Sequence, residues 1–195
     1  MQEKGKIIFL NGVSSAGKSS LAKAIQEASE REMYHLAGDT ILHMLNEKLY
    51  ESGSLAEIVA RLRDGLLLFV LSVKLFSDHG KDLVMDTVCV DDGLNHLNQI
   101  IDTLKGYPVM MVQVDCSPEA LDRREAERGD RQRGQARGQL AMQHPSLAYD
   151  LRLDSSKESC QECARKVLDL FENPSQWKSF ELLRAEDYIS AKKLG

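Results

Sequence analysis

Short apolar runs alternate along the chain with longer segments in which apolar residues recur at helical spacing. The runs predict five β-strands, the last with a weaker pattern than the others, at residues 7–10, 34–37, 83–85, 109–114 and 149–154. The segments between them predict helices at residues 19–31, 40–52, 55–79, 92–105, 118–142 with an interruption, and 156–172. Strands that are apolar almost throughout and are separated by helices indicate a parallel sheet covered on both faces, and therefore an α/β fold.

The length of the chain favours one domain with a short appended segment. The chain has 195 residues, of which 43% are hydrophobic, and this is enough for a real core. The pair Asn173-Pro174 ends the last predicted helix, because proline interrupts helices. We therefore expect one domain at residues 1–174 and a docked helix or arm at residues 175–195, which carries several large apolar side chains.

Charge and hydropathy narrow the range of partners. A net charge of −5 and a pI near 5.6 argue against a general nucleic-acid binder, since such proteins rely on basic surface. The most apolar window, residues 66–76, is interrupted by Ser72 and Lys74 and is too short to span a bilayer. The first six residues are polar and do not resemble a signal peptide. We expect a cytoplasmic protein with no membrane or nucleic-acid partner.

The four cysteines and five histidines do not form a metal or disulfide pattern. Cys160 and Cys163 make one C-x-x-C pair inside a predicted helix, but a zinc site of this kind needs a second pair that the sequence lacks. Two cysteines on a helix face are the simpler interpretation. The histidines are scattered, and none forms a ligand pair at helical spacing.

Residues 12–19 read G-V-S-S-A-G-K-S and fit the phosphate-loop pattern G-x-x-x-x-G-K-[ST] at every fixed position. They follow a predicted strand and precede a predicted helix, which is the order that the phosphate-binding mechanism requires. Backbone N–H groups of the loop and the helix N-terminus attract an anion, Lys18 can reach the β- and γ-phosphates, and the Ser19 hydroxyl can bind Mg²⁺. With ATP and Mg²⁺ as the expected cofactors, we assign ATP binding to Gly12, Val13, Ser14, Ser15, Ala16, Gly17, Lys18, Ser19 and Ser20.

Aspartates follow several predicted strands, at the edge where parallel α/β sheets bind ligands. Asp39 follows the second strand and is predicted to act as a general base or orienting group for an acceptor hydroxyl. A helix N-cap is the alternative for Asp39, and the two roles can coexist. Asp86 follows the third strand and is predicted to support Mg²⁺ directly or through water, with Asp91 and Asp92 as competitors for that role. Asp115 follows the fourth strand at the same edge.

An arginine-rich segment at residues 123–137 holds six arginines and two glycines. Arginines on a glycine-hinged segment suit a lid that closes over phosphates, because guanidinium groups donate to phosphoryl oxygens and stabilise transition-state charge. A solvated charged helix is the alternative, since acidic residues are interspersed in the same segment. Behind a phosphate loop we favour the lid, at about residues 124–140.

Four blocks of the sequence resemble the chloramphenicol phosphotransferase family. They are the phosphate loop with its Ser-Ser-Ala interior, the Gly-Asp-Thr triplet, the Glu-Arg-Gly-Asp-Arg lid motif and the final strand-to-helix junction, at residues 11–19, 38–40, 127–131 and 149–159. The blocks follow the family's order between residues 7 and 170.

The resemblance implies a P-loop kinase of the nucleoside-monophosphate-kinase-like type, with a five-stranded parallel core and with ATP and Mg²⁺ as cosubstrates. It implies that Asp39 is the base toward an acceptor hydroxyl, which in the family is the primary hydroxyl of chloramphenicol, and so a link to antibiotic resistance. It also implies that Arg124 lies near the adenine and that Arg128 and Arg131 lie near the phosphates, with Arg131 acting in catalysis. Residues 41–80, which should wall the acceptor pocket, have no convincing match.

We interpret the chain as a small-molecule kinase that transfers the γ-phosphoryl group of ATP to a hydroxyl of a compact acceptor. One alternative is a kinase for another acceptor, such as a nucleotide sugar in the manner of zeta-type toxins. Another is a regulatory module that binds ATP without transfer, for which a carboxylate at Asp39 has no use. The helices with Leu45, Leu49, Leu62, Leu66 and Phe69 are interpreted as the acceptor wall, as plain core or as the dimer face of a homo-oligomer.

Overall fold

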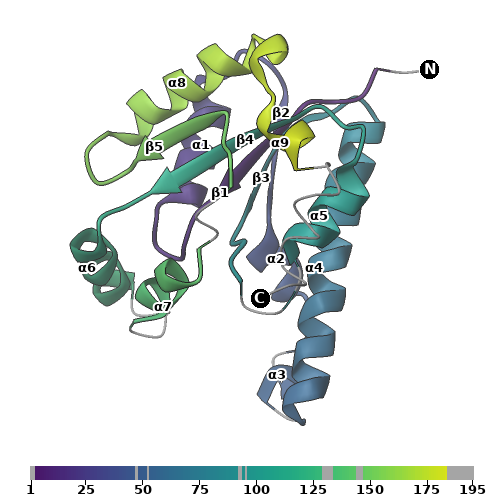
Figure 1. Ribbon diagram of the computed structural model, residues 1–195, viewed down its shortest axis with the longest axis vertical. Helices are drawn as coiled ribbons and strands as arrows, with labels where there is room; N and C mark the ends of the chain where they lie inside the picture. Colours follow the sequence, from purple (N-terminus) through teal and green to yellow (C-terminus); the bar gives the residue numbers. More distant parts are fainter. Residues whose placement is uncertain are drawn as a thin grey trace.

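The computed structural model describes residues 3–46, 48–51, 53–91, 94, 96–128, 134–143 and 147–183. A five-stranded sheet runs through the middle of the molecule, with helices on both of its faces (Figure 1). Its strands are β1 (Ile7–Asn11), β2 (Met33–Ala37), β3 (Asp82–Thr87), β4 (Val109–Asp115) and β5 (Leu151–Asp154). The predicted α/β fold with five parallel strands is therefore confirmed.

The strands lie in the order β2-β3-β1-β4-β5, and every neighbouring pair is parallel. The register pairs Asn11 at the end of β1 with Thr87 of β3 and with Gln113 of β4. All five strands consequently end at one edge of the sheet. Segments that follow different strands, and are far apart in the sequence, converge there.

Alternate residues of β1 enter two separate cores. Ile8 and Leu10 pack in a cluster with α1 (Lys18–Ala28) and α8 (Cys160–Phe171), whereas Ile7 and Phe9 pack in a cluster with α4 (Leu55–Asp78) and α5 (His96–Leu104). Figure 1 shows α1 and α8 on one side of the sheet and α4 and α5 on the other. Successive side chains of a strand point to opposite faces of the sheet. A strand that is apolar almost throughout therefore needs helices on both faces.

The remaining helices are short and lie mostly around the edge where the strands end. They are α2 (Gly38–Leu42), α3 (Lys48–Glu51), α6 (Pro118–Arg128), α7 (Gln135–Ala141), a 3₁₀ turn at Pro174–Gln176 and α9 (Ser179–Leu182). Phe180 of α9 is fully buried in the same core as α4 and α5, and the Trp177 ring stacks on Phe171. Residues 184–195 of the predicted arm lie outside the described part of the chain. Among the helices described, none is long and apolar enough to cross a membrane.

Several predicted helices are wrong in their bounds. The helix predicted at residues 40–52 is two short helices, because Asn46 accepts a hydrogen bond from the Lys48 N–H and forms a local turn that competes with the helix. The helix predicted from residue 156 begins at Cys160, and a turn bound to the Asp154 carbonyl oxygen precedes it. The helix predicted from residue 92 begins at His96, and residues 92, 93 and 95 lie outside the described part.

A capping box fixes the start of α8 and gives a stability prediction. The Ser159 hydroxyl accepts a hydrogen bond from the Glu162 N–H, and the Glu162 carboxylate accepts one from the Ser159 N–H. We expect Ser159→Ala to lower the free energy of unfolding by about 1 kcal/mol, because the Glu162 N–H loses its hydroxyl acceptor. Urea denaturation measures the change, with Ser159→Asp as the variant that keeps a capping side chain and Ser175→Ala as the exposed control. A Ser159→Ala protein as stable as the wild type would contradict this account.

Candidate functional site

The phosphate loop leaves β1 at a point where only glycine fits. A Cβ added to Gly12 would lie 2.5 Å from the Val114 carbonyl oxygen of β4, so the loop packs directly on the neighbouring strand. The loop enters α1 through Gly17, whose φ of 93° is the left-handed conformation that favours glycine. The first helical residue is therefore Lys18, and the N–H groups at the start of α1 face the hollow of the loop.

Lys18 is folded over this loop. Its ammonium group donates to the Gly12 and Val13 carbonyl oxygens at 2.9 and 3.0 Å, and the residue is only 7% exposed. The Ser15 hydroxyl is also buried, and it has no hydrogen-bond partner among the described residues. A buried cation and an unpartnered buried hydroxyl, both beside converging N–H groups, fit the phosphates of a nucleotide.

Arg124 of α6 supports the loop from outside the cavity. Its guanidinium group donates to the Ser15 carbonyl oxygen at 3.3 Å and to the hydroxyl and carbonyl oxygens of Ser155 at 3.0 and 2.8 Å. The Ser155 hydroxyl in turn donates to the Ala16 carbonyl oxygen at 2.7 Å. The segment that follows β5 and the start of the predicted lid thus hold the loop between them. These contacts occupy the carbonyl oxygens of Ser15 and Ala16 in the loop.

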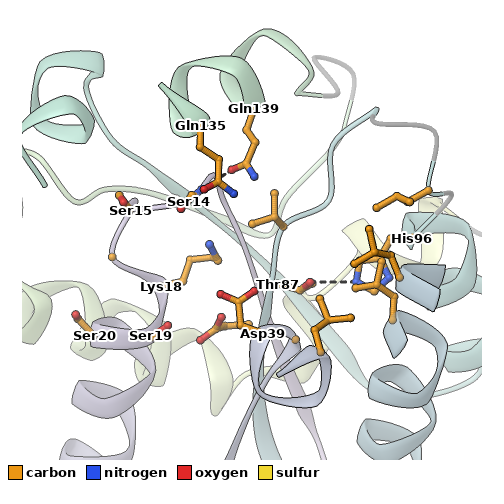
Figure 2. A pocket seen from close by; sticks show the side chains of 18 residues that line it. Ser14, Ser15, Lys18, Ser19, Ser20, Asp39, Thr87, His96, Gln135 and Gln139 are labelled. Carbon is orange, nitrogen blue, oxygen red and sulfur yellow. Dashed lines mark hydrogen bonds between the residues drawn. The ribbon is translucent and has the colours of Figure 1, made fainter. Parts of the chain in front are cut away.

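A cavity of about 280 Å³ opens between the phosphate loop and the elements that follow β2 and β3 (Figure 2). It brings together six of the nine predicted loop residues, but not Gly12, Val13 or Ala16, and both predicted carboxylates, Asp39 and Asp86. In Figure 2, Lys18, Ser19 and Asp39 face the same space. The lining residues are Ser14, Ser15, Gly17, Lys18, Ser19, Ser20, Gly38, Asp39, Leu42, Leu62, Leu66, Asp86, Thr87, Val88, Leu94, His96, Gln135 and Gln139.

Asp39 lies in the first turn of α2, which begins directly at the end of β2. It is exposed to solvent. No side-chain hydrogen bond caps α2, and the N-cap position is Ala37. The alternative role of Asp39 as an N-cap is therefore wrong. Asp39 lines the same cavity as the phosphate loop.

Asp86 is the penultimate residue of β3 and is bound by a histidine from the neighbouring strand. The His35 ring nitrogen Nε2 lies 2.7 Å from Asp86 Oδ2, and Asp86 is 5% exposed. Asp91 does not line the cavity, and its N–H donates to the Met142 carbonyl oxygen, while Asp92 lies outside the described residues. Asp115, the predicted aspartate after β4, instead accepts hydrogen bonds from Arg152 and Gln113.

A magnesium ion in this cavity would have few protein ligands. Within the part of the chain described, no cluster of three or more His, Cys, Asp or Glu side chains is arranged to hold a metal. This fits Mg²⁺, because it keeps several waters and commonly binds one or two protein oxygens together with substrate phosphates. The Ser19 hydroxyl and the Asp86 carboxylate both line the cavity and supply such oxygens.

The side of the cavity away from the loop is largely apolar. Leu62 and Leu66 of α4 line it, whereas Phe69 is fully buried in the core and Leu49 is partly exposed outside it. The structure therefore divides the predicted leucine-rich wall between cavity and core. Leu42, Val88 and Leu94 complete this wall and were not identified from the sequence.

Two polar groups on this wall were also missed. The Thr87 hydroxyl lies 3.0 Å from His96 Nε2, and His96 is 3% exposed (Figure 2). Burial lowers the pKa of His96 to about 4, so the ring is neutral at neutral pH. Thr87 directly follows Asp86 and could have been noticed as the last residue of its strand. His96 carried no signal, because a single histidine in a helix is ordinarily a core residue.

Part of the predicted lid lies outside the described residues. Arg131 falls there, as do residues 129, 130, 132 and 133, and the Arg128 side chain is not described either. The flanking helices α6 and α7 are described, and the interruption predicted within residues 118–142 falls between them. Gln135 and Gln139 of α7 reach the cavity, and neither was predicted as a site residue.

The chain is similar to proteins of known family. The family model described as chloramphenicol phosphotransferase-like protein matches residues 5–172. Two Mycobacterium tuberculosis proteins, named "Putative O-phosphotransferase MT2714" (strain CDC 1551 / Oshkosh) and "Putative O-phosphotransferase Rv2636" (strain ATCC 25618 / H37Rv), are each 29% identical to it over 209 residues. The alignment covers 93% of this chain and 88% of each relative.

Solved structures share the fold at lower identity. The APS kinase CysC of Mycobacterium tuberculosis, in complex with AMPPNP and APS, is 23% identical with a TM-score of 0.64, covering 88% of this chain and 100% of that one. Shikimate kinase from Acinetobacter baumannii, in complex with shikimate, is 17% identical with a TM-score of 0.60, covering 87% and 96%. The predicted P-loop kinase fold is confirmed by this likeness.

Burial of His96 gives a pH prediction. Its pKa in the folded protein lies below the value of about 6.5 in an unfolded chain, so the folded state binds fewer protons between about pH 4 and 6.5. The contribution of the neutral His96 ring to the free energy of unfolding is therefore fully present above about pH 6.5 and is lost as the pH falls toward 4. Between about pH 7.5 and 5.0 we expect the wild type to lose about 2 kcal/mol more unfolding free energy than His96→Asn, which does not titrate in this range. Equal losses in the two proteins, measured by urea denaturation, would contradict the burial of a neutral ring.

Proposed function

The chain belongs to the chloramphenicol phosphotransferase-like family, and we propose that it is an ATP-dependent O-phosphotransferase. It transfers the γ-phosphoryl group of ATP to a hydroxyl group of a compact organic acceptor. The observation that carries the proposal is a single cavity lined both by the phosphate loop with Lys18 and by the Asp39 carboxylate. The names of the relatives that cover most of the chain agree with this reaction.

ATP binds with its phosphates in the loop of residues 12–20. The loop N–H groups and the start of α1 hold the phosphate oxygens, and Lys18 exchanges its loop carbonyl partners for the β- and γ-phosphates. Arg124 keeps the loop in shape and borders the adenine side, while Arg128 and Arg131 of the lid contact the phosphates. Ser19 and Asp86 would hold Mg²⁺, directly or through water, and the ion would supply positive charge beside the phosphates.

Asp39 acts on the acceptor. The acceptor oxygen attacks the γ-phosphorus, the bond from that phosphorus to the bridging oxygen of ADP breaks, and the hydroxyl proton passes to the Asp39 carboxylate. Lys18 and Arg131 stabilise the charge that develops on the transferred group. The position of Asp39 supports this role. Asp39 lines the cavity from the end of β2, whereas the phosphate loop lines it from the end of β1.

The lining of the cavity favours a neutral acceptor. Of the described residues that line it, Lys18 is the one cation, and it belongs to the phosphate site, while Asp39 and Asp86 are acidic. His96 is neutral because of its low pKa. An acceptor with its own negative charges, such as a nucleotide sugar, would find no further cation among the described residues of this wall, whereas a partly apolar alcohol of the chloramphenicol class matches the leucines and the Thr87 hydroxyl.

Replacement of Asp39 tests the reaction. We expect Asp39→Asn to lower phosphoryl transfer by about 10²- to 10⁴-fold, because the amide cannot accept the proton. ATP affinity, measured by calorimetry, stays within about threefold, since the carboxylate faces the acceptor and not the nucleotide. Asp102→Asn, at an exposed position of α5, is the matched control.

Two outcomes, one for Asp39→Asn and one for the wild type, separate the alternative functions. Loss of ATP binding together with activity would move Asp39 into the nucleotide site. A wild type that binds ATP but transfers phosphate to none of a panel of neutral alcohols and nucleotide sugars would favour the regulatory module.

A further inference from the structure

Helix α7 presents two carboxamides to the phosphate loop. Gln135 and Gln139 are four residues apart, so they lie on one face of the helix, and both line the cavity. The Gln139 side-chain oxygen Oε1 accepts a hydrogen bond from the Ser14 N–H at 2.6 Å (Figure 2). One N–H group of the phosphate loop is thus hydrogen-bonded to a side chain of α7.

We propose that Gln139 contacts the γ-phosphoryl group of ATP, and that its carboxamide exchanges the Ser14 N–H for a phosphate oxygen when ATP binds. Gln139 is then a further substrate-contacting residue of the transfer reaction. This inference rests on the proposed function, because it takes ATP as the ligand of the loop.

The helix that carries Gln139 is fixed in place by charged side chains. The Glu125 carboxylate of α6, which is 3% exposed, accepts from the Gly134 N–H at 2.9 Å and from the Ala136 N–H at 2.7 Å. Arg137 pairs with Asp122 through contacts of 2.7 to 3.0 Å. The beginning of α7 is therefore tied to α6 on two sides. Such a helix keeps the Gln139 side chain within reach of the loop whether or not ATP is bound.

The far end of α7 is tied to the segment that follows β3. The Met142 carbonyl oxygen, one residue beyond the helix, accepts a hydrogen bond from the Asp91 N–H at 2.8 Å. Gln139 accordingly lies between the loop and the segment that follows β3. Under the proposed function an acceptor approaches the phosphate chain from this segment, so the γ-phosphoryl group is the part of ATP that Gln139 would meet.

The chemistry of a carboxamide suits this exchange. A glutamine side chain offers an acceptor oxygen and an NH₂ group with two donors, and rotation about one terminal bond interchanges them. A phosphate oxygen takes over the Ser14 N–H, and the carboxamide then turns its NH₂ group toward the same phosphoryl group. Such a neutral donor stabilises charge that develops during transfer, as carboxamides do in oxyanion sites.

Two substitutions at Gln139 and two nucleotides test the inference. Gln139→Glu has nearly the same shape but can only accept, so its carboxylate would repel the γ-phosphoryl group; we expect its Kd for ATP to rise about tenfold or more and its Kd for ADP to stay within about threefold. Gln139→Leu has neither donor nor acceptor, and we expect it to slow transfer about tenfold or more while ATP binding changes little. Gln161→Leu, on the exposed face of α8, is the matched control.

Calorimetry with ATP and with ADP gives the decisive comparison, and circular dichroism establishes that each variant is folded. Equal losses for ATP and ADP in Gln139→Glu, or no loss for either, would overturn the inference, as would a Gln139→Leu enzyme of normal rate. A wild type that binds neither nucleotide would overturn the proposed function itself. If Gln139→Glu does not fold, the rate and ATP affinity of Gln139→Leu decide the question.

Discussion

The contact between Gly12 and the Val114 carbonyl oxygen sets the position of the phosphate loop. A Cβ at residue 12 would lie 2.5 Å from that oxygen, so any other side chain would push the loop away from the sheet. With glycine there, the chain turns sharply at the end of β1 and reaches Gly17, whose left-handed conformation starts α1. The N–H groups of the turn then converge over the edge at which all five strands end.

The rest of the site depends on that edge. Because β2 and β3 run parallel to β1, Asp39 and Asp86 lie at the same edge of the sheet as the loop. The Asp86 carboxylate is bound by His35, which leaves Asp39 as the exposed carboxylate of the cavity. The segment after β5 contributes Ser155, which binds both the Ala16 carbonyl oxygen and Arg124. The segments that follow β1, β2 and β3 line one cavity, an arrangement that can hold two molecules side by side.

Local sequence features predicted the parts of the site that follow from local chemistry. The loop could be identified from its glycines and lysine, because their spacing is itself the mechanism of phosphate binding. The strands could be identified because a strand buried on both faces has few polar positions. Asp39 was found because it closely follows a predicted strand, at the edge where ligands bind.

Features that depend on contacts distant in sequence were missed or misjudged. The prediction of one helix at residues 40–52 was wrong, because the Asn46 side chain forms a turn that apolar spacing does not reveal. Gln139 belongs to the site only because Glu125 and Asp122 fix α7 beside the loop, and neither contact has a sequence pattern. His96 becomes neutral only through burial behind Thr87. Such groups acquire their roles from packing, which periodicity does not describe.

The central claim is that this cavity transfers a phosphoryl group from ATP to an alcohol. Phosphorus NMR of the wild-type protein with ATP, Mg²⁺ and chloramphenicol or another neutral alcohol tests it most directly, because it distinguishes a phosphate ester from inorganic phosphate. The account predicts a new phosphomonoester signal that grows in step with ADP and needs both the protein and the alcohol. ADP that accumulates only with inorganic phosphate, for every alcohol supplied, would contradict it.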